Sequence, residues 1–432
     1  MLRKKYKIRR DKRGVWLTDI DLELLHLIWQ HRVLSLSQLK FYCLELYGIS
    51  KDTTEKKLKR WRKLNVVHSK NYMNNPFGMI YYRIGRQGVK ILENEEMIPK
   101  GDTSYKEIMV PTANTDHFFA TRDVVIRTLV EFKKNKRNIV SHHPSTLPYL
   151  EKDSDAFPLV VPDWILSNEF GFLNIELDTG SESLSMIEEK IGKYVKYASQ
   201  RPDEIYHVLL VVLDDTDKAL RYKKEYGMDR SRRIASVKDS IIRANVHVHS
   251  NLFFYVVSMN RAIQVASNIM TGIYPISPEE RSREIEAIIS LLEMNITFEY
   301  EIARLNEDEF YLPDVDRSLY ADSHLLFKSK NSSKGHVVLI KIMEEGSVKC
   351  LDQIEYLNRL RNEKRFKAKT EVNKILAIYR KNEELQNDHL GKQLNHIMFG
   401  TSQQLANNFE QSPMFYQTVT QYKKEGVLLY ER

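Results

Sequence analysis

The pattern of apolar and polar positions predicts helices and short strands in alternation. From Leu17 to His31, apolar residues recur at helical spacing behind Thr18, which is a residue type that commonly begins helices. A second helical segment begins near Ser37 and ends at Gly48, and a third starts in the region of residues 50–54. Two β segments follow, VVHSKNY and MIYYRIG, on either side of the turn NNPFG, and RQGVKILE closes this part of the chain.

Three helices followed by a hairpin are the order of a winged helix-turn-helix, which we expect over residues 16–98. In such a fold the third helix lies in the major groove of double-stranded DNA. That helix is strongly basic, and we expect six of its residues to contact phosphates or base edges: Lys56, Lys57, Lys59, Arg60, Arg62 and Lys63. The hairpin turn near residues 74–77 would touch a neighbouring groove. A solvated basic face or a protein-contact module is the alternative interpretation.

The first 15 residues form a basic arm, MLRKKYKIRRDKRGV. Clustered lysine and arginine in a terminal segment favour contacts with phosphates. We expect this arm to be disordered when no DNA is bound.

Residues 112–270 read as one α/β domain. A helix is predicted at about residues 114–136, and further helices near residues 184–200, 217–226, 233–244 and 261–269. The predicted strands are NIVSHH, PLVVPDWIL, FLNIELD, HVLLVVL and LFFYVVS. Strands and helices in this order predict a mixed sheet covered by helices.

Three carboxylates in this domain are spaced for a Mg²⁺ site. Glu176 and Asp178 point to the same face of their strand, and Asp163 is expected at the end of the preceding strand, near them. Mg²⁺ binds few carboxylates and keeps several waters. Lys190, on the next helix, would supply positive charge for phosphoryl transfer, and His117 is a further catalytic candidate. Each residue also has a structural interpretation, which is a turn cap for the two aspartates, an exposed strand position for Glu176 and a helix surface for Lys190.

These positions resemble the PD-(D/E)XK nuclease superfamily, in which an Asp, a Glu or Asp, and a Lys surround Mg²⁺. Pro162-Asp163 and Glu176 match the first two positions. Asp178 stands where the lysine belongs, and the resemblance implies that Lys190 takes the place of that lysine. Metal ions in such sites lower the pKa of a bound water and orient the scissile phosphate.

A longer resemblance runs from about residue 16 to 200. A winged helix, Asp116-His117, the Pro-Asp pair, IELDTG and then Lys190-x-x-x-Tyr194 look like the plasmid replication-relaxation family. The resemblance implies DNA binding linked to the maintenance of plasmids or related mobile elements.

Residues 272–432 echo the central domain. FYLPDVDRSL places Asp314 opposite Asp163, and HVVLIKIMEEGS follows the pattern of FLNIELDTGSES. In this alignment Lys341 replaces Glu176 and Met343 replaces Asp178, while Lys190 corresponds roughly to Asp352. The fold class expected is therefore α/β, with a winged helix followed by two tandem PD-(D/E)XK restriction-endonuclease-like domains, the second degenerate.

Composition narrows the function without deciding it. The net charge of +8 favours a polyanionic partner, and two cysteines are too few for a disulfide framework. No apolar run approaches a membrane span, so we expect a cytoplasmic protein without membrane contact. Three hypotheses remain open: a Mg²⁺-dependent DNA endonuclease or nickase, a non-catalytic DNA-binding regulator of plasmid replication, partition or transcription, and a subunit of a DNA-processing assembly. A homodimer or other DNA-processing proteins are the possible protein partners.

Overall fold

The computed structural model divides the chain into two compact units. The first contains Met1–Glu169, Asn174–Thr179 and Leu213–Gly227, and the second contains Phe170–Leu173, Gly180–Val212 and Met228–Arg432. The structure describes residues 3–7, 14–72, 79–101, 115–143, 160–180, 182–213, 230–307, 310–331, 335–367, 371–391, 394–408, 410–417 and 427–428. The wing turn at 74–77 and the helix expected at 217–226 lie outside these ranges. The domain boundaries derived from the sequence stay predictions.

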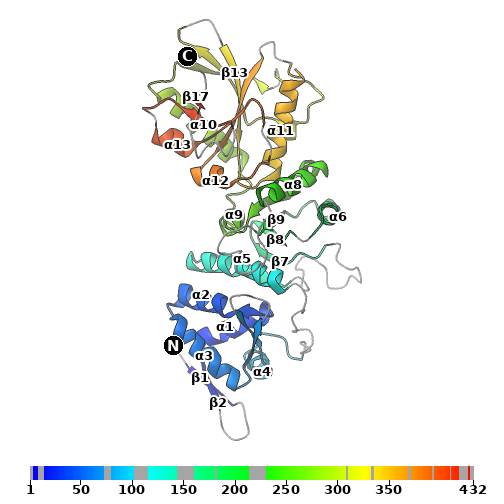
Figure 1. Cartoon of the computed structure of the whole chain (residues 1–432), viewed down its shortest axis with the longest axis vertical. Coiled ribbons are helices and arrows are strands. Elements are labelled where there is room, and N and C mark those ends of the chain that lie inside the picture. Colours follow the sequence, from blue (N-terminus) through cyan, green and yellow to red (C-terminus); the bar gives the residue numbers. More distant parts are fainter. Residues whose placement is uncertain are drawn as a thin grey trace. The chain divides into compact units, whose positions relative to one another are not determined.

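The N-terminal module combines four helices with a small antiparallel sheet (Figure 1, blue). The helices are α1 (Asp19–Gln30), α2 (Leu36–Tyr47), α3 (Lys51–Lys63) and α4 (Arg86–Asn94). The strands are β3 (Leu34–Ser35), β4 (Val67–Tyr72) and β5 (Met79–Ile84), in the order β3-β5-β4. Side-chain oxygens begin the first three helices: Thr18 accepts from the backbone of Asp21, Ser35 from Gln38 and Ser50 from Thr53.

Part of the basic arm is ordered, so the expectation of a disordered arm is wrong for these residues. Strand β1 (Arg3–Lys7) pairs antiparallel with β2 (Gly14–Thr18), with Arg3 opposite Thr18. Lys4 Nζ also lies 2.7 Å from Glu95 Oε2. The arm alternates polar and apolar residues too weakly for the pairing to be read from sequence, but Val15 and Leu17 on its partner are buried and anchor the pair.

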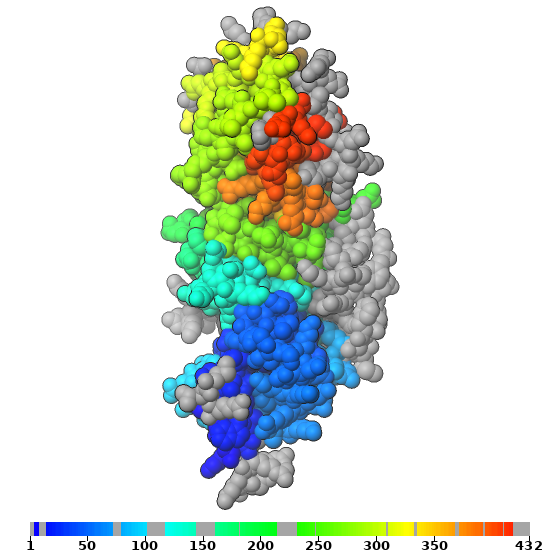
Figure 2. Space-filling model, turned by 90° about the vertical axis from the view of Figure 1, so that its left-hand side faces the viewer, coloured from blue at the N-terminus to red at the C-terminus, as the bar shows by residue number. Residues whose placement is uncertain are grey.

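Helix α5 (Thr115–Lys134) packs against α2 of the N-terminal module. Gln38 Nε2 donates to the carbonyl oxygen of Phe119 at 2.9 Å, and the Arg127 guanidinium lies 4.5 Å from the ring centre of Phe41. Lys134 pairs with Glu45 farther along the helix. In the space-filling view the surfaces of the module (blue) and α5 (cyan) adjoin (Figure 2). Helix α5 is therefore part of the same packed body as the module.

The central sheet has the strand order β10-β9-β8-β7-β6. Its strands are β6 (Val140–His142), β7 (Trp164–Asn168), β8 (Gly171–Asp178), β9 (Tyr206–Val212) and β10 (Leu252–Ser258). Its later helices are α6 (Leu184–Gln200), α8 (Arg230–Arg243), η2 (Val246–Val248) and α9 (Ala262–Met270). β6 runs antiparallel to β7, whereas β9 and β10 are parallel. The mixed α/β class expected from the sequence is confirmed.

A second sheet repeats this order of elements. Its strands, in the order β11-β12-β13-β14-β15, are β11 (Tyr300–Arg304), β12 (Ser323–Ser329), β13 (Gly335–Ile342), β14 (Val372–Tyr379) and β15 (Ile397–Thr401). Its helices are α10 (Pro278–Met294), η4 (Arg317–Leu319), α11 (Val348–Asn362), α12 (Asn382–Asn387) and α13 (Ser402–Asn407). β16 (Met414–Phe415) and β17 (Val427–Leu428) form a short pair. Around both sheets the elements follow one another along the chain in the same order: a helix, three strands, a helix and two further strands.

Candidate functional site

Asp163 comes directly before β7 and not at the end of a strand, so that part of the sequence prediction is wrong. Pro162 has no backbone N–H to pair, and the strand begins only at Trp164. Because β7 and β8 are neighbours joined by a short turn, the start of β7 lies beside the end of β8. Asp163 Oδ2 accepts a hydrogen bond from Leu177 N at 2.8 Å. Because Asp163 lies directly before β7, it is close to Glu176 and Asp178 at the end of β8.

His117, near the start of α5, completes this arrangement. Its Nε2 lies 2.8 Å from the carbonyl oxygen of Leu177 and 3.1 Å from Asp163 Oδ2. Both neighbours are acceptors, so Nε2 must carry a proton. His117 therefore acts as a donor that joins α5 to the ends of β7 and β8. Through this nitrogen it does not serve as a base.

Glu176 and Asp178 flank Leu177 on β8, and both are buried, with exposed fractions of 1% and 2%. Every residue of β8 from Leu173 onward is buried, so both faces of this strand are covered. The interpretation of Glu176 as an exposed strand residue is therefore wrong. A buried carboxylate is costly unless hydrogen bonds or opposite charges compensate for lost water, which sets these two residues apart from ordinary surface acids.

Arg122 is a site residue that the sequence analysis missed. It lies on α5, is 2% exposed, and its guanidinium is 3.2 Å from the ring centre of Phe118 and 4.3 Å from that of Trp164. Burial lowers the pKa of Arg122, while the charge of Asp163 opposes that shift. An arginine inside the apolar run FFATRDVVIRTLV was the available signal, because arginine is rarely buried without a partner charge.

A buried histidine, His31, also contacts Trp164. His31 stacks on Trp164 with 4.6 Å between ring centres, and both of its ring nitrogens are buried and have no hydrogen-bond partner among the described residues. Burial, then the charge of Arg122, lowers the pKa of His31.

Lys190 and Tyr194 lie on α6, in the second unit. Lys190 Nζ is 3.6 Å from Glu182 Oε2, and its side chain is 27% exposed. Tyr194 is buried and contacts Phe254 edge to face, with ring centres 5.9 Å apart. Tyr194 therefore packs in the core beneath α6.

The described residues contain no ready-made metal centre. No three His, Cys, Asp or Glu side chains among them are placed to hold a metal ion. Asp163 is instead engaged by a backbone N–H and by His117. A cage of three carboxylates is thus not assembled by the described side chains, and Mg²⁺ binding stays a prediction.

The second sheet repeats the hydrogen bonding around Asp163 with different residues. Asp322, directly before β12, accepts from Ile342 N at the end of β13 at 2.7 Å. Arg281 of α10 donates to the carbonyl oxygen of Ile342 at 3.0 Å and lies 3.3 Å from Asp322 Oδ2. Arg281 therefore stands where His117 stands in the first sheet, and Asp322 where Asp163 stands. The alignment of Asp314 with Asp163 is wrong, because Asp314 precedes η4 and pairs with Arg365.

Lys341 replaces Glu176 in this second arrangement, as the sequence alignment predicts. Lys341 is 2% exposed, and its ammonium lies 2.7 Å from Asp322 Oδ1. Although burial acts to raise it, Lys341 and Arg281 together hold the pKa of Asp322 below its usual value. The second sheet thus neutralises its aspartate with an internal cation.

The six basic residues predicted to contact DNA do not share one environment. Lys57 pairs with the buried Asp21, and Lys59 pairs with Glu55 at 2.8 Å. Arg62 donates to Ser69 Oγ at 3.2 Å. The remaining three, Lys56, Arg60 and Lys63, are exposed and form no ion pair within the described residues.

These three cations lie on one face of α3. Positions 56, 60 and 63 follow the i, i+4, i+7 spacing of a helical stripe, and so do the buried residues Thr54, Leu58 and Trp61. The two stripes are offset by two residues, which is about 200° around a helix of 3.6 residues per turn. The helix therefore presents its cations directly away from the core of the module.

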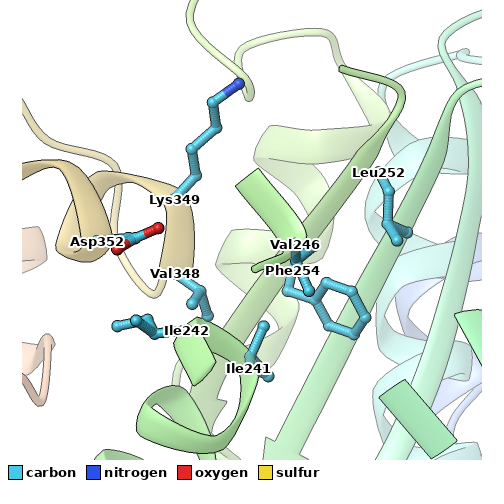
Figure 3. A pocket seen from close by; sticks show the side chains of 8 residues that line it. All are labelled: Ile241, Ile242, Val246, Leu252, Phe254, Val348, Lys349 and Asp352. Atoms are coloured by element: carbon cyan, nitrogen blue, oxygen red, sulfur yellow. The ribbon is translucent and has the colours of Figure 1, made fainter. Parts of the chain in front are cut away.

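One small cavity lies in the second unit between α8, β10 and the first turn of α11 (Figure 3). Apolar side chains line it, including Ile241 and Phe254, while the Lys349 ammonium points away from them. Its volume of about 10 Å³ is no more than one water requires. It is not a substrate site.

Comparison with known proteins identifies the first part of the chain. Residues 25–212 match the model of the replication-relaxation family. This segment is therefore similar to the replication-relaxation family. The family resemblance expected from the sequence is confirmed, and the matched segment contains α3, Asp163, Glu176, Asp178 and Lys190. Comparisons with curated proteins and with solved structures found no match. Among the described residues, no helix is both long and apolar enough to cross a membrane.

Proposed function

We propose that this chain binds double-stranded DNA in the replication of a plasmid or related element, with α3 as the recognition helix of a winged helix. The order of three helices and a hairpin, and the family of residues 25–212, support this assignment. The observation that carries it is the exposed stripe of Lys56, Arg60 and Lys63. Unneutralised cations on a helix surface release counterions from DNA when they bind phosphates.

The proposal separates the roles of the basic residues on α3. Lys56 and Arg60 contact DNA, whereas Lys57 holds α3 to α1 through Asp21. Lys40 and Lys59 both pair with Glu55, so α3 is also fixed to α2. The recognition face is thus carried on a helix that ion pairs link to α1 and to α2.

Fluorescence anisotropy with labelled duplexes tests this function, using the origin of the chain's own element and an unrelated duplex. Lys56→Ala/Arg60→Ala is expected to weaken binding and to reduce the slope of log K against log salt by about 2, since each lysine or arginine on a phosphate contributes about 1. Lys90→Ala, an exposed lysine on α4, is the matched control and should leave binding unchanged. Equal binding by the double variant and the wild type would refute the proposal.

A second candidate function is metal-dependent cleavage of the bound DNA. It is favoured by the comparison of the two sheets, in which Glu176 takes the position of Lys341. Where the second sheet supplies its own cation to an aspartate, the first places another buried carboxylate. Asp163 and Glu176 would then hold Mg²⁺, which in such sites activates a water. Asp178 would assist, and Lys190 would stabilise charge on the phosphate.

Calorimetric titration with Mg²⁺ and Mn²⁺ separates the two candidates, together with incubation of supercoiled plasmid. The second candidate requires that the wild type bind metal and relax or linearise the plasmid, and that Glu176→Gln lose both while still binding DNA. DNA binding without metal binding or cleavage leaves a non-catalytic regulator of replication, partition or transcription. A homodimer and other DNA-processing proteins stay predictions as partners.

A further inference from the structure

The second sheet carries a basic surface at the end opposite to Asp322 and Lys341. The surface begins at the C-terminal turns of α11 and continues to the first residues of β14 and the residue before β15. β14 runs parallel to β13, and Lys374 pairs with Val338 near the start of that strand, whereas Lys341 lies near its end. The surface is therefore not a remnant of the carboxylate site. The basic residues of these segments are Arg359, Arg361, Lys364, Lys367, Lys374 and His396. Of these, Arg361 and Lys374 lie close enough to His396 to act on its charge.

The cations of this surface are poorly neutralised. Arg361, Lys364, Lys367 and Lys374 form no ion pair within 4.0 Å in the part of the chain that the structure describes. The neighbouring acids include Asp314 and Glu363, which both pair with Arg365, and Glu371. Burial, and then the charges of Arg361 and Lys374, lower the pKa of His396, while Glu371 opposes this. Two of these three charged side chains are cations.

A cavity of about 310 Å³ opens within this surface. Its polar side chains are the Lys374 ammonium, the His396 ring and the amides of Asn395 and Gln417, and each of them can donate a hydrogen bond. No carboxylate of a described residue lines it. Such a lining suits an anion that accepts several hydrogen bonds, and a phosphate group is of that kind.

Two backbone features fix the geometry of this cavity. Arg361 Nε donates to Val372 O at 2.8 Å, which holds the guanidinium beside the start of β14. His396 has a φ of 67°, in the left-handed region that residues other than glycine rarely adopt. Such conformations persist only where the surrounding structure enforces them, and they gather at binding sites.

We propose that this surface is a second contact for DNA, in which the backbone lies along the end of α11 and one phosphate enters the cavity beside Lys374 and His396. The inference rests on the proposed DNA-binding function for its partner but on separate residues for its evidence. It gives the second sheet, which has a lysine in place of Glu176, a function of its own: it adds affinity that does not depend on base sequence.

The test is salt-dependent anisotropy on the full chain with a labelled duplex. Lys364→Gln/Lys367→Gln/Lys374→Gln is expected to reduce the slope of log K against log salt by about 3, because three phosphate contacts are removed. Lys328→Gln/Arg283→Gln removes two exposed cations elsewhere in the same unit and should leave the slope unchanged. Thermal unfolding of each variant should match the wild type, since the three lysines form no ion pair with any residue that the structure describes.

An unchanged slope in the triple variant would overturn the inference, and so would an equal change per charge in the control variant. The inference would also be overturned if the triple variant lost binding to single-stranded RNA but bound the DNA duplex as the wild type does, since DNA would then not be the partner of this surface. A different result would show that the proposed function of α3 is wrong. In that case Lys56→Ala/Arg60→Ala binds DNA as the wild type does, whatever the triple variant does.

Discussion

Asp163 and Asp322 make equivalent hydrogen bonds in the two sheets. Each precedes the first strand of a hairpin and accepts from the backbone N–H near the end of the second strand. In each case a donor from the preceding helix, His117 or Arg281, bonds the carbonyl oxygen of that same second-strand residue. The aspartate is thus required for packing whether or not a metal binds beside it.

Replacing Asp163 should therefore cost stability. Asp163→Ala leaves Leu177 N without its acceptor and removes the charge beside Arg122, so the free energy of unfolding should fall by about 1–3 kcal/mol. Asp163→Asn keeps an acceptor oxygen and should lose less. Urea denaturation of both variants measures the difference, and equal stability of wild type and alanine variant would contradict this role.

His31 gives the chain a sensitivity to acid. An unfolded histidine has a pKa near 6.5, and burial next to Arg122 and His143 keeps His31 neutral at lower pH. Below pH 6.5 the unfolded state therefore binds more protons than the folded state, and the free energy of unfolding falls as pH is lowered. His143 adds to this, because burial lowers its pKa to about 3.

His31→Phe should keep the ring on Trp164 and remove two buried nitrogens that have no partner. We expect its melting temperature at pH 7 to equal or exceed that of the wild type, and its loss of stability between pH 7 and 5 to be smaller. His31→Ala is the control, and it should be less stable at every pH because it leaves a cavity. A pH dependence equal to that of the wild type in His31→Phe would contradict the assignment.

At the scale of elements, Gln38 joins helix α2 to its neighbours through both ends of its amide. The oxygen accepts from Ser35 N at 2.9 Å and closes the capping box of α2, while the nitrogen donates to Phe119 O at 2.9 Å on α5. The two contacts serve different purposes, since one begins a helix and the other docks α5 on the module.

Two substitutions distinguish these contacts. Gln38→Ala loses both and should destabilise the chain by about 1–2 kcal/mol. Gln38→Glu keeps the acceptor for Ser35 but turns a buried carboxylate oxygen toward Phe119 O, so it should be less stable than the alanine variant at pH 7. Chemical denaturation measures both, and a glutamate variant as stable as the wild type would show that the α5 contact contributes nothing.

Elements were predictable where local signals agreed. The bounds of α6 and β10 follow from the sequence because Ser183 caps a regular apolar stripe and LFFYVV is an unbroken apolar run. The start of β7 and the equivalence of Asp322 were not predictable, because the letters Pro-Asp at 162–163 and 313–314 look alike. Only strand pairing reveals which aspartate lies beside the end of the next strand. Arg122 was missed because its surroundings come from three separate elements.

At the scale of the whole molecule, the basic residues behind the net charge of +8 fall into exposed groups and buried ion pairs. One exposed group of cations lies on α3 and another at the end of α11, in different units of the chain. Several basic side chains elsewhere, among them Arg261 and Lys238, are buried in ion pairs with Glu345 and Asp388 and contribute nothing to the outer field. The overall charge alone did not distinguish these groups.

Two separate contacts on one DNA molecule predict a dependence on duplex length. The wild type should gain affinity as the duplex is lengthened until both contacts are made, and its salt slope should rise in step. The Lys364→Gln/Lys367→Gln/Lys374→Gln variant should lose that gain, with little difference from the wild type on the shortest duplex. Joining it to Lys56→Ala/Arg60→Ala should reduce the slope by about 5 in all, the sum of the separate effects of about 2 and about 3. Anisotropy across a series of duplex lengths measures this, and a gain of affinity with length that the triple variant retains in full would place the second contact elsewhere.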